Sequence, residues 1–519
     1  NGMYKDTKLA DYNSNTFYRR YNVTSNLTLN PFRTTEIKLG IQGYLANANY
    51  PASSQASIFE SAYFTPPTYI APLYPDGKLG AFSGGDINPV AQLGATGYAN
   101  QWRSQVYSNL RITQQIYKGL SVSGMFSFDT YNYTSNRFTK TPNTYHATGR
   151  DANGNLLYEQ TRQGTENLAY SLSAKGNRAI YLEAAINYRN TFGKHTVSGT
   201  MLFNQSDEIN TKATNVEEAL PYRFRGLAGR FTYSFDDRYF GEFNFGYNGS
   251  ENFAPKNRYG FFPSVGLGWV ISNEPFFRGA TEVIQYLKLR GTWGRVGNSQ
   301  ISGRRFAYLA TVKDTNDTSY QFGKNMDQTY GTTAIDEYAV DVTWEIADKT
   351  NIGLDMRLLN NKFNLQFDAF KESRKGIYLR RTSIPSYFGM INNPYGNIGK
   401  VENKGIEMSV SYANSWRDWS LSVMGNYSFN RNKVLEDDST VAYPWQKTIG
   451  NKVDQRFGLI ALGLFESPEE IAAAPVQVGD TRPGDIRYKD INGDGKIDEY
   501  DKVPIGWGSV PEIVYGFGF

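Results

Sequence analysis

The segment 490–501, with the sequence DINGDGKIDEYD, combines side chains and a spacing that suit a bound cation. Oxygen ligands at positions 1, 3, 5 and 12 of a loop, a carbonyl at position 7 and a glycine at the sharp turn are typical of a calcium site. In this sequence those places are taken by Asp490, Asn492, Asp494, Asp501, Lys496 and Gly495. The spacing predicts a structural calcium ion that stiffens a loop.

An alternative interpretation of the same segment needs no metal. The last position is Asp501, whose side chain is shorter than that of Glu and reaches less readily for a bidentate contact, and no flanking amphipathic helices are evident. Asp and Asn side chains also accept hydrogen bonds from nearby backbone amides in Asx turns. A loop rich in such turns therefore stays open beside the calcium prediction.

Residues for catalysis are sparse. The two histidines are His146, in a predicted loop, and His195, which begins a predicted strand after a turn. The sequence contains no nucleophile elbow, no paired-histidine metal motif and no glycine-rich phosphate loop after a strand. Carboxylates are plentiful, but nothing in the sequence pairs two of them as a glycosidase would require. We therefore expect no enzyme.

The composition favours strands and turns. The chain has 38 Tyr, 32 Phe and 50 Gly among 519 residues, and no Cys, which excludes disulfides, thiol catalysis and zinc–thiolate sites. No apolar run approaches the ~20 residues of a membrane helix, so none is predicted. The net charge of +4 is balanced and dispersed, which argues against a nucleic-acid partner.

Strict two-residue alternation is the dominant pattern. In 239–248, Tyr239, Phe243 and Tyr247 alternate with polar residues such as Glu242 and Asn244. The same alternation recurs in 180–188, 363–369, 406–412 and 419–429. Because successive side chains of a strand point to opposite faces, each of these strands has one apolar and one polar face.

The connections between these strands are short and long in turn. Short turns are predicted at 30–33, 117–119, 192–194, 236–237, 360–361 and 415–418, and long polar segments at 46–100, 132–176, 297–341 and 430–511. Short turns at one rim and long loops at the other are typical of an outer-membrane β-barrel. We count about fifteen strands of about ten residues, which is long enough to cross a bilayer. The alternatives, a soluble β-sandwich, a solenoid or several β-domains, have shorter strands.

A series of motifs makes the sequence resemble one family. They include 225–233 (RGLAGRFTY), 248–253 (NGSENF), 258–264 (RYGFFPS), 294–298 (GRVGN), 351–355 (NIGLD), 402–407 (ENKGIE) and 483–485 (PGD). Together, in this order, they resemble the barrel of the SusC/RagA family, the TonB-dependent importers of the Bacteroidota. The resemblance extends over nearly the whole chain, so 1–519 is interpreted as one transmembrane barrel region with long extracellular loops.

The resemblance implies an all-β antiparallel barrel of about 22 strands in the complete protein, closed by a plug domain. It implies import of oligomers, glycan first and peptide second, with a SusD-like surface lipoprotein, energy from the TonB complex acting through the plug, and a bacterial outer-membrane location in contact with lipid. We expect that plug and closing strands lie outside this sequence. A passive porin-like or structural barrel, and an enzyme or adhesin built on a barrel, stay open as alternatives.

Several aromatic residues of the predicted extracellular loops are candidate contacts for a substrate or a partner. In a sugar importer the rings would stack on pyranose faces, and in a peptide importer they would bury side chains. They would equally serve to pack the loops. The candidates are Tyr63, Phe64, Tyr69, Tyr74, Tyr387, Phe388 and Tyr395.

Overall fold

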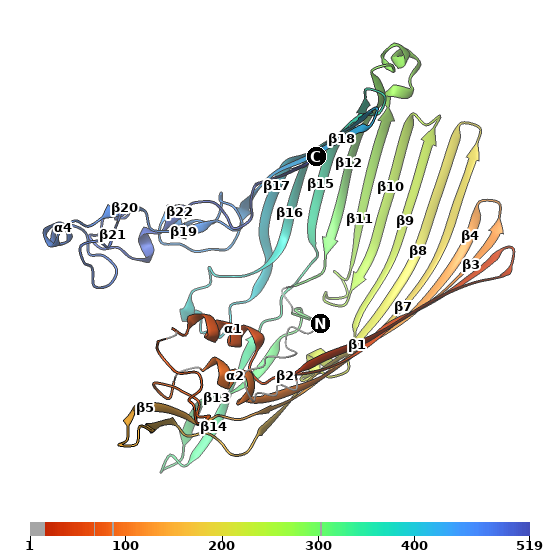
Figure 1. Ribbon diagram of the computed structural model, residues 1–519. Coiled ribbons are helices and arrows are strands. Elements are labelled where there is room, and N and C mark those ends of the chain that lie inside the picture. Colours follow the sequence, from red (N-terminus) through yellow and green to blue (C-terminus); the bar gives the residue numbers. More distant parts are fainter. Residues whose placement is uncertain (1–15, 67, 86–87, 302–303) are drawn as a thin grey trace. The chain divides into compact units, whose positions relative to one another are not determined.

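Fifteen strands form one sheet in the part of the chain that the computed structural model describes, residues 16–66, 68–85, 88–301 and 304–519 (Figure 1). Their order in the sheet is β1-β2-β3-β4-β7-β8-β9-β10-β11-β12-β15-β16-β17-β18-β23. Apart from the hairpins inserted between them, neighbours in the sheet follow one another along the chain. The prediction of a large antiparallel sheet with about fifteen strands is confirmed.

The sheet strands alternate in direction and are long. Their bounds are β1 Phe17–Phe32, β2 Thr35–Pro51, β3 Gly97–Tyr117, β4 Leu120–Thr139, β7 Ala169–Phe192, β8 His195–Asn210, β9 Tyr222–Phe235, β10 Tyr239–Ser250, β11 Tyr259–Val270, β12 Ile284–Asn298, β15 Glu345–Leu358, β16 Phe363–Arg380, β17 Tyr395–Trp416, β18 Trp419–Glu436 and β23 Ile513–Gly518.

Short hairpins and helices occupy the long connections. The hairpin strands are β5 Thr144–Arg150, β6 Leu156–Arg162, β13 Thr311–Phe322, β14 Gln328–Glu337, β19 Arg456–Gly458, β20 Ala461–Leu464, β21 Ile486–Tyr488 and β22 Val503–Ile505. The α-helices are α1 Gln55–Phe64, α2 Pro89–Gly94, α3 Val216–Ala219 and α4 Pro468–Ala473. The 3-10 helices are η1 Ile271–Asn273, η2 Pro275–Ala280, η3 Ser386–Phe388, η4 Pro444–Gln446 and η5 Glu499–Asp501.

A search of the described residues for a helix with the length and apolar character needed to traverse a membrane finds none.

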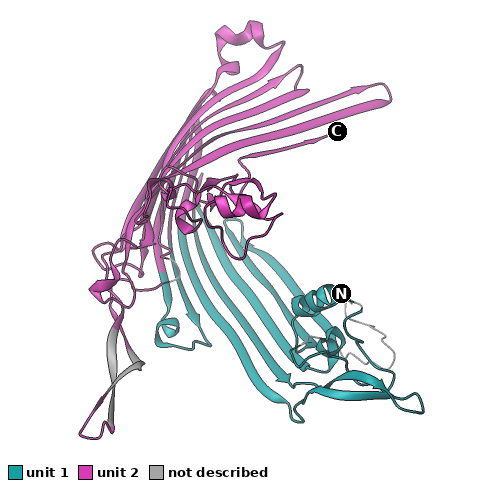
Figure 2. Cartoon of the chain, turned by 90° about the vertical axis from the view of Figure 1, so that its left-hand side faces the viewer, with its two compact units in different colours: residues 1–116, 122–184, 204–223 teal, residues 117–121, 185–203, 224–519 magenta. Residues whose placement is uncertain are grey.

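The chain divides into two compact units, coloured separately in Figure 2. Unit 1 comprises the described residues of Asn1–Ile116, Val122–Ala184 and Asn204–Arg223, and unit 2 comprises Tyr117–Ser121, Ala185–Phe203 and the described residues of Phe224–Phe519.

The strand registers of unit 2 place like side chains in rows. One row, on one face, consists of Leu354, Phe367, Met408 and Tyr427, each paired with the next across β15, β16, β17 and β18. The adjacent row, on the opposite face, consists of Asp355, Gln366, Ser409 and Asn426. Because a shift of one residue would exchange the two faces, this register keeps all apolar side chains together.

The strands extend further toward the long connections than the alternation predicts. The segments expected as loops at 132–176 and 430–511 are shortened at their ends, since β4 continues to Thr139, β7 begins at Ala169 and β18 continues to Glu436. Past the alternating runs, polar side chains occupy both faces while backbone pairing continues, as between Glu402 and Lys433. The sequence pattern therefore disappears before the strand ends.

A small core lies on the long-loop side of unit 2. Its buried members are Phe253, Ile301, Ala307, Val342, Trp344 and Tyr378, and Phe262, Val340, Ile346 and Tyr395 pack against it. The ring of Trp344 lies 5.1 Å from that of Phe253 and 5.0 Å from that of Phe262. This packing holds the connection between β12 and β15 against the strand ends.

Candidate functional site

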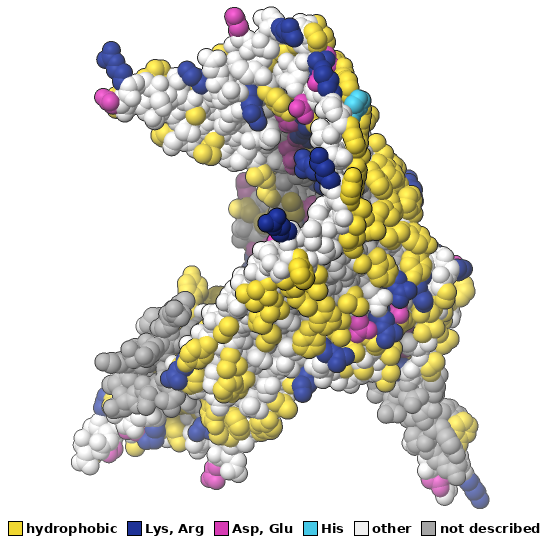
Figure 3. Space-filling view, turned by 90° about the vertical axis from the view of Figure 1, so that its right-hand side faces the viewer, with side chains coloured by type: hydrophobic (Ala, Val, Ile, Leu, Met, Phe, Trp, Pro, Cys, Tyr) yellow, Lys and Arg dark blue, Asp and Glu magenta, His cyan; other side chains and the backbone are white. Residues whose placement is uncertain are grey.

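Aromatic and aliphatic side chains cover one face of the sheet in unit 2. Along β10, Phe243 faces Phe231 on β9 and Val265 on β11, and Tyr247 faces Leu227 and Phe261. These side chains stay accessible, with Phe243 39% and Tyr247 44% exposed. In Figure 3, hydrophobic side chains gather in broad areas over the strands. A continuous apolar face of this kind suits contact with lipid hydrocarbon.

Ion pairs mark the end of the apolar band toward the long loops. On the same face, next after Trp293, Arg295 of β12 lies opposite Asp348 of β15, with Nε 2.7 Å from Oδ1. On β16 and β17, Lys371 pairs with Glu402 at 2.8 Å. Since charged groups stay in water or among headgroups, these pairs fit a position at the membrane surface.

The opposite face of the same strands is polar and internally paired. The guanidinium of Arg290 on β12 donates to Asp368 on β16 at 2.6 Å and to Asp355 on β15 at 3.3 Å. Gly353 lies between them, and a Cβ there would come within 2.4 Å of the Arg290 Cζ atom. The missing side chain lets the guanidinium cross a whole strand to reach its partner.

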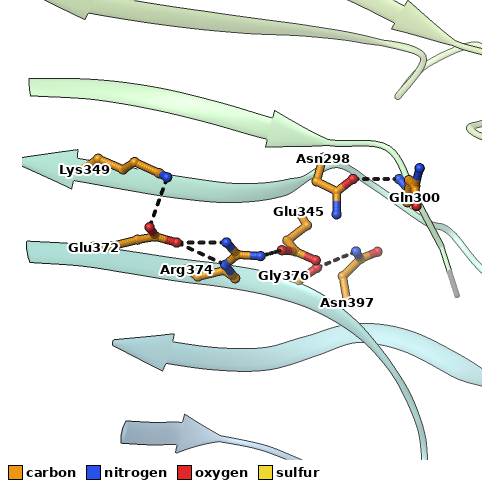
Figure 4. Close-up of polar contacts among 8 residues, drawn as sticks. All are labelled: Asn298, Gln300, Glu345, Lys349, Glu372, Arg374, Gly376 and Asn397. Atoms are coloured by element: carbon orange, nitrogen blue, oxygen red, sulfur yellow. Dashed lines mark hydrogen bonds and ion pairs between the residues drawn. The ribbon is translucent and has the colours of Figure 1, made fainter. Parts of the chain in front are cut away.

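A second polar network lies nearer the long loops on this face (Figure 4). Glu372 bridges Lys349 at 3.1 Å and Arg374 at 2.9 Å, and Arg374 also binds Glu345 at 2.8 Å. Beside the network, the Asn397 side chain donates to the Gly376 carbonyl at 2.7 Å. This polar face, called the inner wall from here on, therefore offers paired charges of both signs at fixed positions.

Sequence reasoning named none of these wall residues as a site. Their signal was present in the alternation, because polar residues at every second position mark the water-facing side. The partners themselves depend on register across strands such as β12, β15 and β16, which alternation within one strand does not determine.

The candidate aromatic residues of unit 1 fall into two kinds. Tyr63 and Phe64 end helix α1, are 86% and 71% exposed, and contact each other edge to face at 5.5 Å. Tyr69 instead packs beside Phe82, at 5.7 Å between ring centres, and the Tyr74 hydroxyl accepts a hydrogen bond from the Ala147 amide at 3.0 Å. The first pair is free to meet a partner, whereas the other two hold the loop together.

The candidate aromatic residues of unit 2 divide in the same way. Tyr387 and Phe388 stack at 5.4 Å and are 83% and 64% exposed. Tyr395 stacks on the buried Tyr378 at 4.9 Å, and the guanidinium of Arg304 lies 5.4 Å from the Tyr395 ring centre. Tyr395 therefore belongs to the small core. Contact of these rings with a substrate or partner stays a prediction.

The segment 490–501 is held by side chain to backbone hydrogen bonds. Asp490 accepts from the amides of Gly493 and Gly495 at 2.6 and 2.9 Å, and Asp494 accepts from the Lys496 amide at 3.0 Å. Asp501 is completely buried, and its carboxylate accepts from the Ile491 and Asp498 amides at 2.8 and 2.9 Å. These are the contacts expected of the loop rich in Asx turns.

A converging metal site is not among these contacts. Within 16–66, 68–85, 88–301 and 304–519, no group of three or more His, Cys, Asp or Glu side chains is placed to hold a metal ion. The arrangement thus adds no support to the calcium prediction at Asp490, Asn492, Asp494, Lys496 and Asp501, which continues to rest on spacing.

The two histidines lie apart from these networks. The ring of His146 contacts that of Phe82 at 4.9 Å, and Nδ1 of His195 hydrogen-bonds with the Tyr233 hydroxyl at 2.8 Å. Both contacts are ones that structural residues make in loops and at strand ends.

Comparison with known proteins agrees with this architecture. The profile of the family described as "TonB dependent receptor-like, beta-barrel" matches residues 4–500. TonB-dependent receptor P26 of Formosa agariphila is 26% identical over 511 residues, covering 92% of this chain and 49% of that protein. TonB-dependent receptor SusC of Bacteroides thetaiotaomicron is 29% identical over 280 residues, covering 53% and 27%. The chain thus spans half or less of the length of these curated relatives.

The fold has a counterpart among solved structures. The RagAB peptide transporter superposes with a TM-score of 0.70 and 18% identity, over 97% of this chain and 56% of that chain. The resemblance to SusC/RagA barrels is confirmed, and so is the outer-membrane location. This chain belongs to the TonB dependent receptor-like β-barrel family, whose members are transporters of the bacterial outer membrane and not enzymes.

Proposed function

We propose that the chain forms the barrel wall of an active importer of oligomeric nutrients, glycan first and peptide second. The TonB complex supplies the energy through a plug region, and a SusD-like lipoprotein cooperates at the cell surface. The membership of the family and the likeness to SusC support this assignment.

The single observation that carries the proposal is the two-faced wall. Apolar rows such as the one through Phe367 alternate with polar rows such as the one through Gln366 over neighbouring strands. Side chains on the outer rows suit hydrocarbon, and those on the inner rows suit a water-filled passage. Bulky polar solutes cross a bilayer only through such a passage.

The long connections support the role of a partner at the outer rim. Tyr63, Phe64, Tyr387 and Phe388 expose large apolar rings on the long connections, which we assign to the extracellular side. Exposed aromatic rings are enriched where proteins bind one another, and they also stack on sugars. We assign these four rings to contact with the lipoprotein or its cargo.

The substrate class rests on resemblance. RagAB is described as a peptide transporter, but at 18% identity its likeness shows fold alone. SusC, at 29% identity, is nearer in sequence. The order of the two classes, glycan before peptide, follows only from the resemblance to the SusC/RagA family.

Uptake measurements test the proposal. Cells expressing the full-length protein should accumulate labelled oligosaccharides, and a protonophore should abolish this accumulation. A strain in which the TonB complex is disrupted is the matched control. It should accumulate as little labelled oligosaccharide as cells treated with the protonophore. Uptake that continues unchanged without a proton gradient would refute active import and favour a passive porin-like barrel.

Purification of the intact protein from its membrane tests the partner and the cargo. A surface lipoprotein should copurify in equal amount, and mass spectrometry of the retained oligomer should identify sugar rather than peptide. Recovery of the barrel alone would contradict the partner proposal, and a retained peptide would reverse the order of the two substrate classes.

A further inference from the structure

A cavity of about 610 Å³ opens on the polar face of unit 1. It is bounded by the ends of β2, β3 and β4, by the start of β7, and by the segment that leads into helix α1. Ala99, Gln101 and Arg103 line it from alternate positions of β3, whereas Trp102 between them is not part of the lining. The volume lies within the range of sites that hold small ligands.

Two arginines bring positive charge to this cavity without a neutralising carboxylate. Arg103 donates to the Gln101 side chain at 3.0 Å and lies 5.1 Å from the ring centre of Tyr133, and Arg137 donates to the Ala52 carbonyl. None of the residues that line the cavity is acidic. Neither arginine forms an ion pair with any residue that the structure describes.

Arg111 provides a contrast on the same strand and the same face. It lies eight positions further along β3 and forms an ion pair with Glu183 at 3.0 Å. Elsewhere on the inner wall, Arg290 and Arg374 also bind carboxylates. Arg103 and Arg137 thus present guanidinium groups that are available for an anion, which guanidinium binds through paired hydrogen bonds.

The rest of the lining is rich in hydroxyl and amide groups. Ser53, Ser135, Ser171 and Ser173 supply hydroxyls, and Gln55 supplies an amide. The Tyr50 and Tyr133 rings line the same space. Hydroxyls, amides and aromatic faces together match a sugar, which carries many hydroxyl groups and an apolar ring face. Ile58 and Leu172 add apolar side chains to the lining.

We propose that this cavity binds an acidic sugar unit, carboxylated or sulfated, of the imported oligomer. Arg103 and Arg137 hold the anionic group, and the serine hydroxyls and tyrosine rings hold the sugar ring. The assignment rests on the proposed import function and adds to it a preference for acidic glycans.

Calorimetric titration of the purified full-length protein tests this site. The probes are oligogalacturonate, the fully methyl-esterified oligomer of the same length, and a sulfated galactan oligomer. We expect the wild type to bind at least one acidic probe about tenfold or more tightly than the ester, with an affinity that falls as salt rises. Arg103→Ala combined with Arg137→Ala should remove this preference and leave binding of the ester unchanged.

Arg33→Ala is the matched control, because it removes an exposed arginine of unit 1 in the short turn between β1 and β2. It should retain the acidic preference. The two acidic probes separate carboxylate from sulfate recognition. Equal affinity of the wild type for all three probes would overturn the inference, and so would an acidic preference that survives in the double variant.

The outcome is separable from that of the import proposal. Gradient-dependent uptake of neutral oligomers without any acidic preference would leave active import intact and refute the acidic site. Acidic binding that depends on the two arginines, combined with uptake that ignores the proton gradient, would refute active import and leave the site in place.

Discussion

The strand wall and the insertion between β18 and β23 bury opposite kinds of side chain, although both belong to unit 2. In the wall, apolar rings such as Phe243 lie on an accessible face, and the polar side chains pair with one another on the other face. In the insertion, Phe465 is 1% exposed and Ile497 is 4% exposed, so the apolar side chains lie inside. The contrast is the one expected between a wall that separates hydrocarbon from water and a loop region that is surrounded by water.

The two regions also use hydrogen bonds differently. The wall satisfies its backbone through long ladders such as that between β17 and β18. The insertion has only short pairs, β19 with β22 and β20 with β21, and relies on side chains such as Asp501 to satisfy backbone amides. Loss of one carboxylate should therefore lower the local stability of the insertion more than that of the wall. Replacement of an apolar side chain by a charged one should destabilise the wall more than the insertion.

The largest expected effect is the introduction of a charge on the apolar face. Phe367→Arg places a cation between Leu354 and Met408, in the middle of the apolar band. We expect the free energy of unfolding in phospholipid vesicles to fall by about 2–4 kcal/mol, because an arginine near the bilayer centre must leave water. Urea titrations of the refolded full-length protein would measure this difference.

The adjacent substitution Gln366→Arg is the matched control. It points to the opposite face, between Asp355 and Ser409, where a cation has a carboxylate neighbour. Its effect should stay within about 0.5 kcal/mol of the wild type, as is usual for exposed positions. Equal losses in the two variants would contradict the assignment of the faces.

Removal of the buried carboxylate of the insertion should give the next largest effect. Asp501→Ala removes the acceptor of the partly buried Ile491 and Asp498 amides. An unsatisfied buried donor costs about 1–3 kcal/mol, so the insertion should open locally while the wall stays folded. Hydrogen exchange should rise in 456–505 and stay unchanged in β15 to β18.

Asp501→Asn keeps the shape of the side chain but removes its charge and one of its two acceptor oxygens. Asparagine keeps one side-chain oxygen for the Ile491 amide but presents an amino group toward the Asp498 amide. The hydrogen-exchange rate of 456–505 in the asparagine variant should lie between the rates of the wild type and of the alanine variant. Loss of the whole barrel signal in either variant would show that the insertion and the wall unfold as one.

Comparison of the two regions also explains what the sequence allowed us to predict. Alternation identified β10, β16, β17 and β18, because apolar side chains occupy one face of these strands and polar side chains the other. The ion pair of Arg290 with Asp368 was not predictable, since it joins residues far apart in sequence through register. The hairpin of β5 with β6 was missed because its strands are short and lack sustained alternation, as the adjacent Leu156 and Leu157 show.

The insertion was predictable only as a motif. The spacing of Asp490, Asn492 and Asp494 predicted a calcium site, with a loop rich in Asx turns as the alternative. The structure has the hydrogen bonds of that alternative, and calcium stays a prediction. The burial of Asp501 was not predictable, because it depends on how the loop folds around this residue. Its capping box with Asp498 is a local pattern three residues apart that the sequence analysis did not use. In the cavity of unit 1, Arg103 and Arg137 were missed because their grouping, like the burial of Asp501, depends on the fold.

The junction of the two regions should respond to pH. Glu512 precedes β23 and binds Arg431 of β18 at 2.8 Å and Lys452 of the insertion at 2.8 Å, and these two cations hold the pKa of Glu512 at about 2. A carboxyl whose pKa is depressed on folding stabilises the fold above its unfolded pKa of about 4.3. This stabilisation should disappear as the pH falls from about 4.3 to about 2.

Hydrogen exchange of residues 513–518 measures this response. The wild type should lose protection across that pH interval, and Glu512→Gln should be less protected at pH 7 with a flatter pH profile. Glu436→Gln removes the 61% exposed partner of Lys400 and is the matched control, with a profile like that of the wild type. Identical profiles for Glu512→Gln and the wild type would contradict the role of Glu512.

Calcium binding should have the smallest effect on stability. That effect should be confined to the insertion between β18 and β23. At a calcium concentration of 1 mM, a site with the affinity of extracellular modules would add about 0.4–1.4 kcal/mol of local stability. The hydrogen bonds of Asp490 to Gly493 and Gly495 leave lone pairs on both carboxylate oxygens, so these contacts and a cation are compatible. We predict slower exchange of 490–501 with calcium than with a chelator, and no such difference in Asp494→Ala. Equal exchange rates of the wild type with calcium and with chelator would contradict the calcium prediction. The loop would then be held by its side chain to backbone hydrogen bonds alone, and the contrast with the wall would rest on those bonds and not on a metal ion.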